Sequence, residues 1–285
     1  TVILSVPLIL EKIYKKMIQP QISKKPVSWV LKMPLLDKVV LNKIRETLMN
    51  AFGGEFSQII IGGAPLNAEV EAFLRRIKFP VTVGYGMTET APLISFTPWT
   101  DFRSQSCGQV LKGFMDARIA NPDMDGVGEI QVRGENVMAG YYKNEQATKE
   151  SFTADGWLRT GDLGIIDKDG FIYIKGRCKT MLLGPSGQNI YPEEIEAKIN
   201  NMPYVLESLV LQKEDTKLVA LVCPDFEAVD ADHLTQEQLD LAMDENRKLV
   251  NQQLAAYEQI NLIKLYPHEF EKTPKKSIKR FLYQA

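Results

Sequence analysis

The sequence GYGMTET occupies residues 84–90, directly after the apolar run FPVTV at residues 79–83. Val and Thr suit a pleated surface, so the run predicts a buried strand that ends at the first glycine. The glycines on either side of Tyr85 let the backbone turn sharply and approach a ligand closely. Thr88 adds a hydroxyl that can bond a phosphate oxygen, and Glu89 adds a carboxylate that suits Mg²⁺. A purely structural turn is the alternative, because isolated glycine-rich motifs are common in loops.

A second glycine-containing loop lies just upstream. The run QIII at residues 58–61 predicts another strand, GGAPL at residues 62–66 predicts a loop, and residues 67–78 carry apolar side chains at helical spacing. A strand, a helix and a strand in this order form a crossover unit, and the strands of such a unit pair in parallel. Both glycine loops should therefore lie at the carboxyl edge of one sheet, where open α/β sheets bind ligands.

The composition is ordinary for a globular protein and argues against several functions. Of the 285 residues 45% are hydrophobic and 25% are charged, and the net charge of -2 gives no general attraction to nucleic acid. The cysteines Cys107, Cys178 and Cys223 have no metal-ligand spacing, which favours a reduced, cytoplasmic protein. The two histidines lie in no triad or zinc pattern. The apolar start at residues 1–10 is shorter than the roughly 20 residues that cross a bilayer.

The rest of the chain predicts an α/β protein with two further parts. Residues 113–120 with 128–134, and residues 163–166 with 171–174, read as hairpins separated by turn residues. We therefore expect a parallel sheet in residues 1–104 and a small antiparallel sheet or distorted barrel in residues 105–178. Residues 179–285 predict a small α+β domain, with strands at 208–212, 217–223 and 260–265 and a long helix that ends near Glu258.

Three later segments carry candidate site residues. The sequence DGWLRTGDLG at residues 155–164 places Asp162 after a glycine, where a carboxylate can accept bonds from two ribose hydroxyls or simply cap a turn. The sequence GRCK at residues 176–179 includes Arg177, whose fork of donors suits ribose or phosphate oxygens, although a solvated surface arginine has the same pattern. Residues 138–144 between the hairpins are assigned an architectural role.

Together, these ordered motifs resemble the adenylate-forming (AMP-binding) superfamily, and they look most like its long-chain fatty acyl-CoA ligases. The resemblance implies an enzyme that uses ATP, Mg²⁺ and coenzyme A. It implies that Tyr85 stacks on adenine, that Thr88 contacts phosphate, that Glu89 holds Mg²⁺, and that Asp162 and Arg177 hold the ribose. It also implies that Gly63, Ala64, Pro65, Gly86 and Met87 line the nucleotide site, that Lys179 is the hinge before the mobile small domain, and that Gly187 lies in a loop near the pantetheine of coenzyme A.

The basic run KTPKKSIKR at residues 272–280 holds five cations in nine residues. The family has here a lysine that enters the active site as the adenylate forms, and a flexible point charge suits that step. When the flanking residues are aligned, this lysine falls on Ser277, so the adjacent Lys276 is the candidate. A solvated tail, or one that contacts an anionic membrane surface, is the alternative.

The sequence thus predicts an AMP-forming acyl-CoA synthetase that acts through an acyl-adenylate on a fatty acid. The family has a Ser/Thr/Gly-rich phosphate loop further upstream, and no segment here matches it. We therefore expect a carboxyl-terminal portion of the enzyme that is inactive alone. A non-catalytic binder of nucleotide or acyl-adenylate, and an enzyme that loads a carrier protein, are the alternatives. The acyl chain length, the oligomeric state and membrane association stay open.

Overall fold

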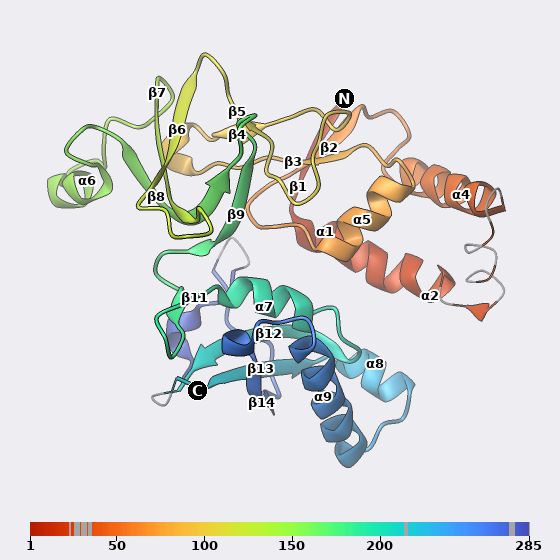
Figure 1. The fold of residues 1–285 in the computed structure, drawn as a ribbon. Coiled ribbons are helices and arrows are strands. Elements are labelled where there is room, and N and C mark those ends of the chain that lie inside the picture. Colours follow the sequence, from red (N-terminus) through yellow and green to blue (C-terminus); the bar gives the residue numbers. More distant parts are fainter. Residues whose placement is uncertain are drawn as a thin grey trace. The chain divides into compact units, whose positions relative to one another are not determined.

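Parallel strands form the sheet around which the first part of the chain folds in the computed structural model (Figure 1). Strands β1 (Val2–Ser5), β2 (Gln58–Ile61) and β3 (Val81–Val83) lie in the order β1-β2-β3, and both pairings are parallel. The register places Ile61 beside Val83 at the carboxyl ends of their strands. The predicted strands at the two glycine loops and their parallel direction are confirmed.

Helix α5 (Ala68–Arg76) forms the crossover between β2 and β3. Asn67 caps it, because its side-chain oxygen accepts the backbone N–H groups of Glu69 and Val70 at 3.0 and 3.3 Å. The side chains that recur at helical spacing are buried, namely Val70, Phe73 and Leu74. The remaining helical segments of this part are α1 (Pro7–Ile13), a π-helical turn η1 (Tyr14–Ile18), α2 (Gln19–Ile22) and α4 (Leu36–Ala51).

An antiparallel sheet follows the parallel one. It has four strands in sequence order, β6 (Met115–Ala120), β7 (Gly128–Gly134), β8 (Leu158–Ile166) and β9 (Ile172–Arg177). Strands β6 and β7 pair antiparallel, as do β7 and β8, so the predicted hairpin of residues 113–134 is confirmed. Smaller elements complete this part: the turn η2 (Thr88–Thr90), the paired strands β4 (Ser95–Phe96) and β5 (Gln109–Val110), and helix α6 (Glu145–Ser151).

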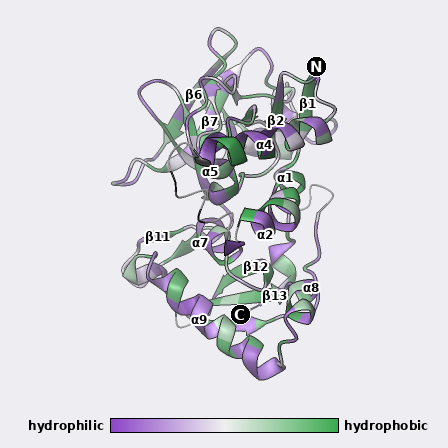
Figure 2. Ribbon diagram, turned by 90° about the vertical axis from the view of Figure 1, so that its right-hand side faces the viewer, coloured by the Kyte–Doolittle hydropathy of each residue, from purple (hydrophilic) through white to green (hydrophobic). Residues whose placement is uncertain are grey.

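The last part of the chain is a separate α+β arrangement. Strand β13 (Leu218–Pro224) lies between β12 (Val205–Gln212), with which it is antiparallel, and β14 (Ile260–Leu265), with which it is parallel. Figure 2 shows hydrophobic residues along β12 and β13 and mostly hydrophilic residues on helix α9 (Gln236–Asn251). The other elements are β10 (Leu182–Leu183), β11 (Asn189–Ile190), α7 (Pro192–Ile199), α8 (Phe226–Ala231), η3 (Ala256–Glu258) and η4 (Arg280–Leu282).

The long helix near the carboxyl end was predicted correctly, but its predicted last residue, near Glu258, is wrong. Helix α9 stops at Asn251, whose side chain donates to the carbonyl of Ile260 at 2.9 Å and accepts the N–H of Ile260 at 2.8 Å. These bonds turn the chain toward β14. A polar side chain at this point therefore ends the helix, although the preceding pattern would allow it to continue.

The structure describes residues 1–22, 24–25, 29, 33, 36–213, 216–273 and 277–284. It divides into two compact units, Thr1–Ile174 and Lys175–Ala285. Each unit has its own hydrophobic core, around Ile59 and Ile61 in the first and around Ile195 and Val222 in the second. Among the described helices, none has the length and apolar character needed to cross a membrane.

Candidate functional site

The two glycine loops begin side by side. The N–H of Gly84, directly after β3, donates to the carbonyl of Ile61, the last residue of β2, at 2.9 Å. A Cβ atom on Gly62 would lie only 3.9 Å from the carbonyl oxygen of Gly84. The shared carboxyl edge predicted from the crossover unit is therefore present, and it brings both loops to one place.

The upstream loop, residues 62–66, is mostly exposed, and its carboxyl end is anchored by the buried Leu66 and by a bond from Asn67. Gly63, Ala64 and Pro65 are exposed, whereas Leu66 is buried in the core. The N–H of Asn67 donates to Oε1 of Glu11 at 3.0 Å. Burial raises the pKa of the Glu11 carboxyl, while the bond from Asn67 acts in the opposite direction. This arrangement leaves the backbone of the loop accessible to a ligand.

Gly86 allows the downstream loop to fold back on itself. The chain returns after residue 90, and the N–H groups of Ile94 and Ser95 donate to the carbonyl of Tyr85 at 2.8 and 3.0 Å. A Cβ atom on Gly86 would lie 1.8 Å from the carbonyl oxygen of Pro92. No other residue type fits this approach, so the second glycine of GYGMTET is required by packing.

The phenol of Tyr85 contacts Asp162, which comes from strand β8. The Tyr85 hydroxyl donates to Oδ2 of Asp162 at 2.6 Å across 77 residues of sequence, and both side chains are buried. The N–H of Asp162 donates to Oγ1 of Thr160 at 3.1 Å, and that hydroxyl donates to the carbonyl of Ile130. Two candidate site residues, one in the loop after β3 and one in β8, are thus brought into direct contact, and the bond to the carboxylate restricts its orientation.

Glu89 and Thr88 lie on the turn that follows, with Thr88 exposed and Glu89 half-buried. The Tyr141 hydroxyl donates to Oε1 of Glu89 at 2.9 Å, and the N–H of Met138 donates to the Glu89 carbonyl at 2.8 Å. The bond to Glu89 raises the pKa of the Tyr141 phenol. Sequence reasoning missed Tyr141, because it assigned residues 138–144 to architecture. Tyr141 and Glu89 are 52 residues apart, so nothing in the sequence indicated that the tyrosine hydroxyl bonds the carboxylate.

The oxygen atoms of Thr88 and Glu89 could bind a hard cation such as Mg²⁺ only together with oxygen ligands from another source. In the described part of the chain, no group of three or more His, Cys, Asp or Glu side chains could hold a metal ion. Glu89 also forms no ion pair with a described lysine or arginine. Because Mg²⁺ is commonly bound by one or two carboxylates together with substrate phosphates, one carboxylate beside a hydroxyl fits a nucleotide-bound Mg²⁺.

Four predicted site residues belong to the second unit, and three of them are among the described residues. Arg177 and Lys179 are exposed near the end of β9, where the N–H groups of Thr180 and Met181 donate to the carbonyl of Arg177. Gly187 lies in the tight turn between β10 and β11, with a φ of +81° that favours glycine. The structure gives the positions of these three residues in the second unit only, so their roles at the nucleotide site stay predictions.

Two described residues of the basic run near the carboxyl end are hydrogen-bonded to each other. The N–H of Thr273 donates to the carbonyl of Ser277 at 2.8 Å, and Lys276, the candidate lysine, lies outside the described residues. Arg280 follows, and its guanidinium donates to both carboxylate oxygens of Glu196 at 2.6 and 2.9 Å. Sequence reasoning did not find this ion pair, because its partners are 84 residues apart.

The comparisons with known proteins agree with this geometry. The family described as AMP-binding enzyme matches residues 1–142. The long-chain-fatty-acid–CoA ligase FadD15 of Mycobacterium bovis is 30% identical over 98% of this chain. The chain belongs to the AMP-binding enzyme family.

A further relative and two solved structures are also similar to this chain. The long-chain-fatty-acid–CoA ligase ACSBG1 of Rattus norvegicus is 33% identical over 66% of this chain and 26% of its own length. The chain spans about half of the mycobacterial relative, or 52% of its length. ATP-bound MatB from Rhodopseudomonas palustris superimposes with a TM-score of 0.68 at 26% identity, over 99% of this chain and 50% of that one. The MenE synthetase of Bacillus subtilis with its acyl-adenylate has the same fold, with a TM-score of 0.71 at 24% identity, over 100% of this chain and 51% of that one.

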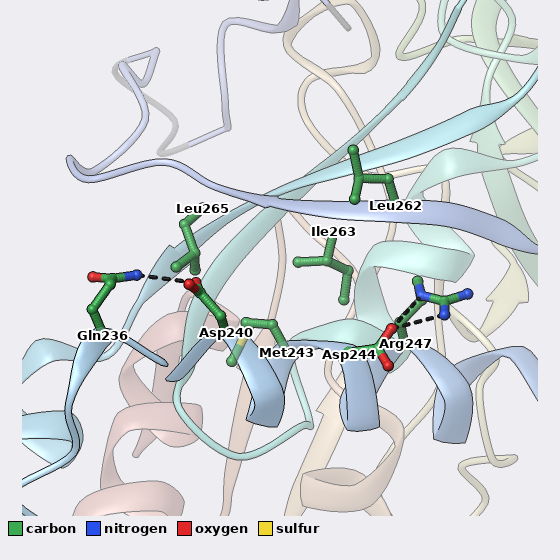
Figure 3. A pocket seen from close by; sticks show the side chains of 8 residues that line it. All are labelled: Gln236, Asp240, Met243, Asp244, Arg247, Leu262, Ile263 and Leu265. Carbon is green, nitrogen blue, oxygen red and sulfur yellow. Dashed lines mark hydrogen bonds and ion pairs between the residues drawn. The ribbon is translucent and has the colours of Figure 1, made fainter. Parts of the chain in front are cut away.

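A pocket of about 350 Å³ in the second unit of this AMP-binding chain is lined by none of the predicted site residues (Figure 3). It lies between α9 and β14, with Met243, Leu262 and Leu265 on its apolar side. Asp244 accepts two bonds from Arg247 at 3.0 and 2.8 Å, and Asp240 accepts one from Nε2 of Gln236 at 3.0 Å. This pocket carries no set of groups suited to acid-base or phosphate chemistry.

Proposed function

We propose that this chain is part of an ATP-dependent long-chain acyl-CoA synthetase. The observation that carries the proposal is the buried bond of 2.6 Å between Tyr85 and Asp162, which joins the GYGMTET turn to the RTGD motif at residues 159–162. The names of the FadD15 and ACSBG1 relatives favour a long-chain fatty acid as the substrate. The ATP-bound MatB structure supports ATP as the nucleotide.

The chemistry consists of two group transfers. A carboxylate oxygen of the fatty acid attacks the α-phosphorus of ATP, and pyrophosphate leaves. The thiol of coenzyme A then attacks the carbonyl carbon of the acyl-adenylate, and AMP leaves. Activation is required because a free carboxylate is a poor electrophile, whereas AMP is a good leaving group.

Residues of the first unit would hold the nucleotide. Asp162, oriented by the Tyr85 hydroxyl, would accept bonds from the ribose hydroxyls, and the ring of Tyr85 would face the adenine. Thr88 would donate to a phosphate oxygen. Glu89 would hold Mg²⁺, which when bound neutralises negative charge on the phosphates. The exposed backbone of Gly63, Ala64 and Pro65, with Gly86 and Met87 opposite, would line the same site.

Residues of the second unit would act by moving. We propose that the small domain turns about Lys179 between the two transfers, as in other hinge closures. Lys276 would then meet the reacting oxygens, and the turn that contains Gly187 would approach the pantetheine, whereas Arg177, which precedes the hinge, would hold the ribose together with Asp162.

The direct test is ATP-pyrophosphate exchange by the complete protein in the presence of fatty acids of graded length. We expect exchange that requires a carboxylate, and we expect Glu89→Gln and Lys276→Ala each to slow it at least about tenfold. An unchanged exchange rate in Lys276→Ala would contradict the role proposed for Lys276, and a faster rate in Ser277→Lys would show that a lysine acts better at position 277. No exchange with any chain length would contradict the proposed activity.

Serine at the aligned lysine position favours a second candidate, a non-catalytic binder of nucleotide or acyl-adenylate. Such a protein would bind ATP or AMP in calorimetry and form no thioester. The third possibility, transfer to a carrier protein, is separated by the acceptor: a holo-carrier protein would replace free coenzyme A as the faster substrate.

A further inference from the structure

The segment from Asn136 to Tyr141, which follows strand β7 of the antiparallel sheet, forms several hydrogen bonds to the GYGMTET turn. Nδ2 of Asn136 donates to the carbonyls of Thr90 and Leu93 at 2.6 and 2.9 Å, so it joins the two arms of the loop. The N–H of Met138 donates to the carbonyl of Glu89 at 2.8 Å. The side-chain amide of Asn136 and the backbone N–H of Met138 therefore fix where the turn lies, because both donate to its backbone carbonyls.

Tyr141 is itself fixed by helix α6. Its N–H donates to Oγ1 of Thr148 at 2.8 Å, and that hydroxyl donates to the carbonyl of Asn144 at 2.9 Å. A Cβ atom on Gly140 would lie 2.6 Å from Cγ2 of Thr148, so only glycine lets the chain pass this close. The backbone of Tyr141 is thus bonded to helix α6, while its phenol reaches Glu89.

The phenol contacts only one oxygen of the Glu89 carboxylate. The Tyr141 hydroxyl donates to Oε1 at 2.9 Å, and no described residue bonds Oε2. A carboxylate on an exposed turn would otherwise rotate freely among its rotamers. The bond restricts that rotation and leaves one oxygen for a cation.

We propose that Tyr141 is a positioning residue that holds Glu89 in the orientation required for the Mg²⁺ of a bound nucleotide. The inference rests on the proposed function, because it concerns the same site. Tyr141 touches neither nucleotide nor metal in this account and acts through Glu89 alone. Loss of the hydroxyl should therefore weaken the Mg²⁺-dependent part of nucleotide binding and leave the Mg²⁺-independent part unchanged.

The test is equilibrium binding of ATP to the complete protein at a series of Mg²⁺ concentrations, measured by calorimetry. We expect Tyr141→Phe to raise the Mg²⁺ concentration for half-maximal enhancement of binding about threefold to tenfold, the range for the net contribution of one typical hydrogen bond. Binding of AMP without Mg²⁺ should not change. The matched control is Tyr142→Phe, since Tyr142 is 88% exposed and its ring faces Lys143 instead of Glu89.

A second variant separates positioning from a general effect on folding. Glu89→Gln should remove most of the Mg²⁺ dependence, and adding Tyr141→Phe to it should change nothing more, because the two side chains act as one unit. If the wild type binds Mg-ATP and Tyr141→Phe needs no more Mg²⁺ than Tyr142→Phe, the role of Tyr141 is wrong and the proposed function stands. If the wild type shows no Mg²⁺-dependent binding of ATP, both are wrong.

Discussion

Gly86→Ala should lower the free energy of unfolding of the first unit by at least about 3 kcal/mol and abolish nucleotide binding. The new Cβ atom would lie 1.8 Å from the carbonyl oxygen of Pro92 and 2.8 Å from Cα of Leu93. These are backbone atoms, so no side-chain rotation relieves the clash. To make room, the loop would have to open and break the bonds between Tyr85 and Ser95. Denaturation in urea, followed by tryptophan fluorescence, measures the loss.

Gly62→Ala is the matched control for this prediction, because Gly62 lies at the end of the neighbouring strand. A Cβ atom there would have Gly84 O as its nearest neighbour at 3.9 Å, which is an ordinary contact. We expect its unfolding free energy to stay within about 1 kcal/mol of the wild type. If Gly86→Ala were as stable as Gly62→Ala, the folded-back loop described here would be incorrect.

Arg280→Met should lower the free energy of unfolding of the second unit by about 3 to 5 kcal/mol, the cost of leaving a buried charge without its partner. Glu196 is 8% exposed and accepts both bonds from Arg280, and it also accepts the N–H of Val210 at 2.6 Å. Nη2 of Arg280 in addition donates to the carbonyl of Val210 at 2.7 Å. The ion pair therefore anchors Arg280, at the end of the basic run, to α7 and β12. In the sequence, Arg280 closely follows the candidate Lys276.

The loss caused by Arg280→Met should grow with pH. Burial raises the pKa of the Glu196 carboxyl to about 7 even with Arg280 in place. Without the guanidinium the pKa rises further, so the folded variant keeps a proton that the unfolded chain has released. A raised carboxyl pKa contributes stability below the unfolded value and loses it as the pH rises through the folded value. The variant should therefore differ least from the wild type at about pH 5 and most at about pH 8.

The control for the ion pair is the double variant Glu196→Gln with Arg280→Met. A glutamine oxygen can still accept the Val210 N–H, and no charge is left buried. We expect the double variant to recover most of the stability lost by Arg280→Met and to lose the added pH dependence. Equal instability of the single and double variants at every pH would show that the loss comes from packing and not from the unpaired carboxylate.

Local patterns in the sequence predicted the parallel pair and its loops. The run at residues 58–61 ends in three β-branched isoleucines, and the observed β2 has the same bounds. The turn at residues 84–90 was predicted from glycines, and Gly86 is now explained by its approach to Pro92. The likeness of the RTGD motif to that of a known family suggested that Asp162 shares a site with Tyr85. These features could be predicted because each depends on neighbours in the sequence or on a motif.

The other site features depend on contacts between distant residues. Tyr141 meets Glu89 across 52 residues, and Arg280 meets Glu196 across 84. A tyrosine in a loop and an arginine in a basic tail are most often packing or solvated residues, so sequence alone favours those roles. The end of α9 at Asn251 is similar, because it depends on bonds to Ile260 in the next strand.

A double-mutant cycle on AMP binding tests most directly whether the GYGMTET turn and Asp162 form one nucleotide site. The complete protein, Tyr85→Phe, Asp162→Asn and the double variant would be compared by calorimetry. We expect each single change to weaken AMP binding, and we expect a coupling energy of about 1 to 2 kcal/mol, because the Tyr85 hydroxyl acts only by orienting the carboxylate it contacts at 2.6 Å. Unchanged affinity in Asp162→Asn, or strictly additive losses in the double variant, would contradict the account.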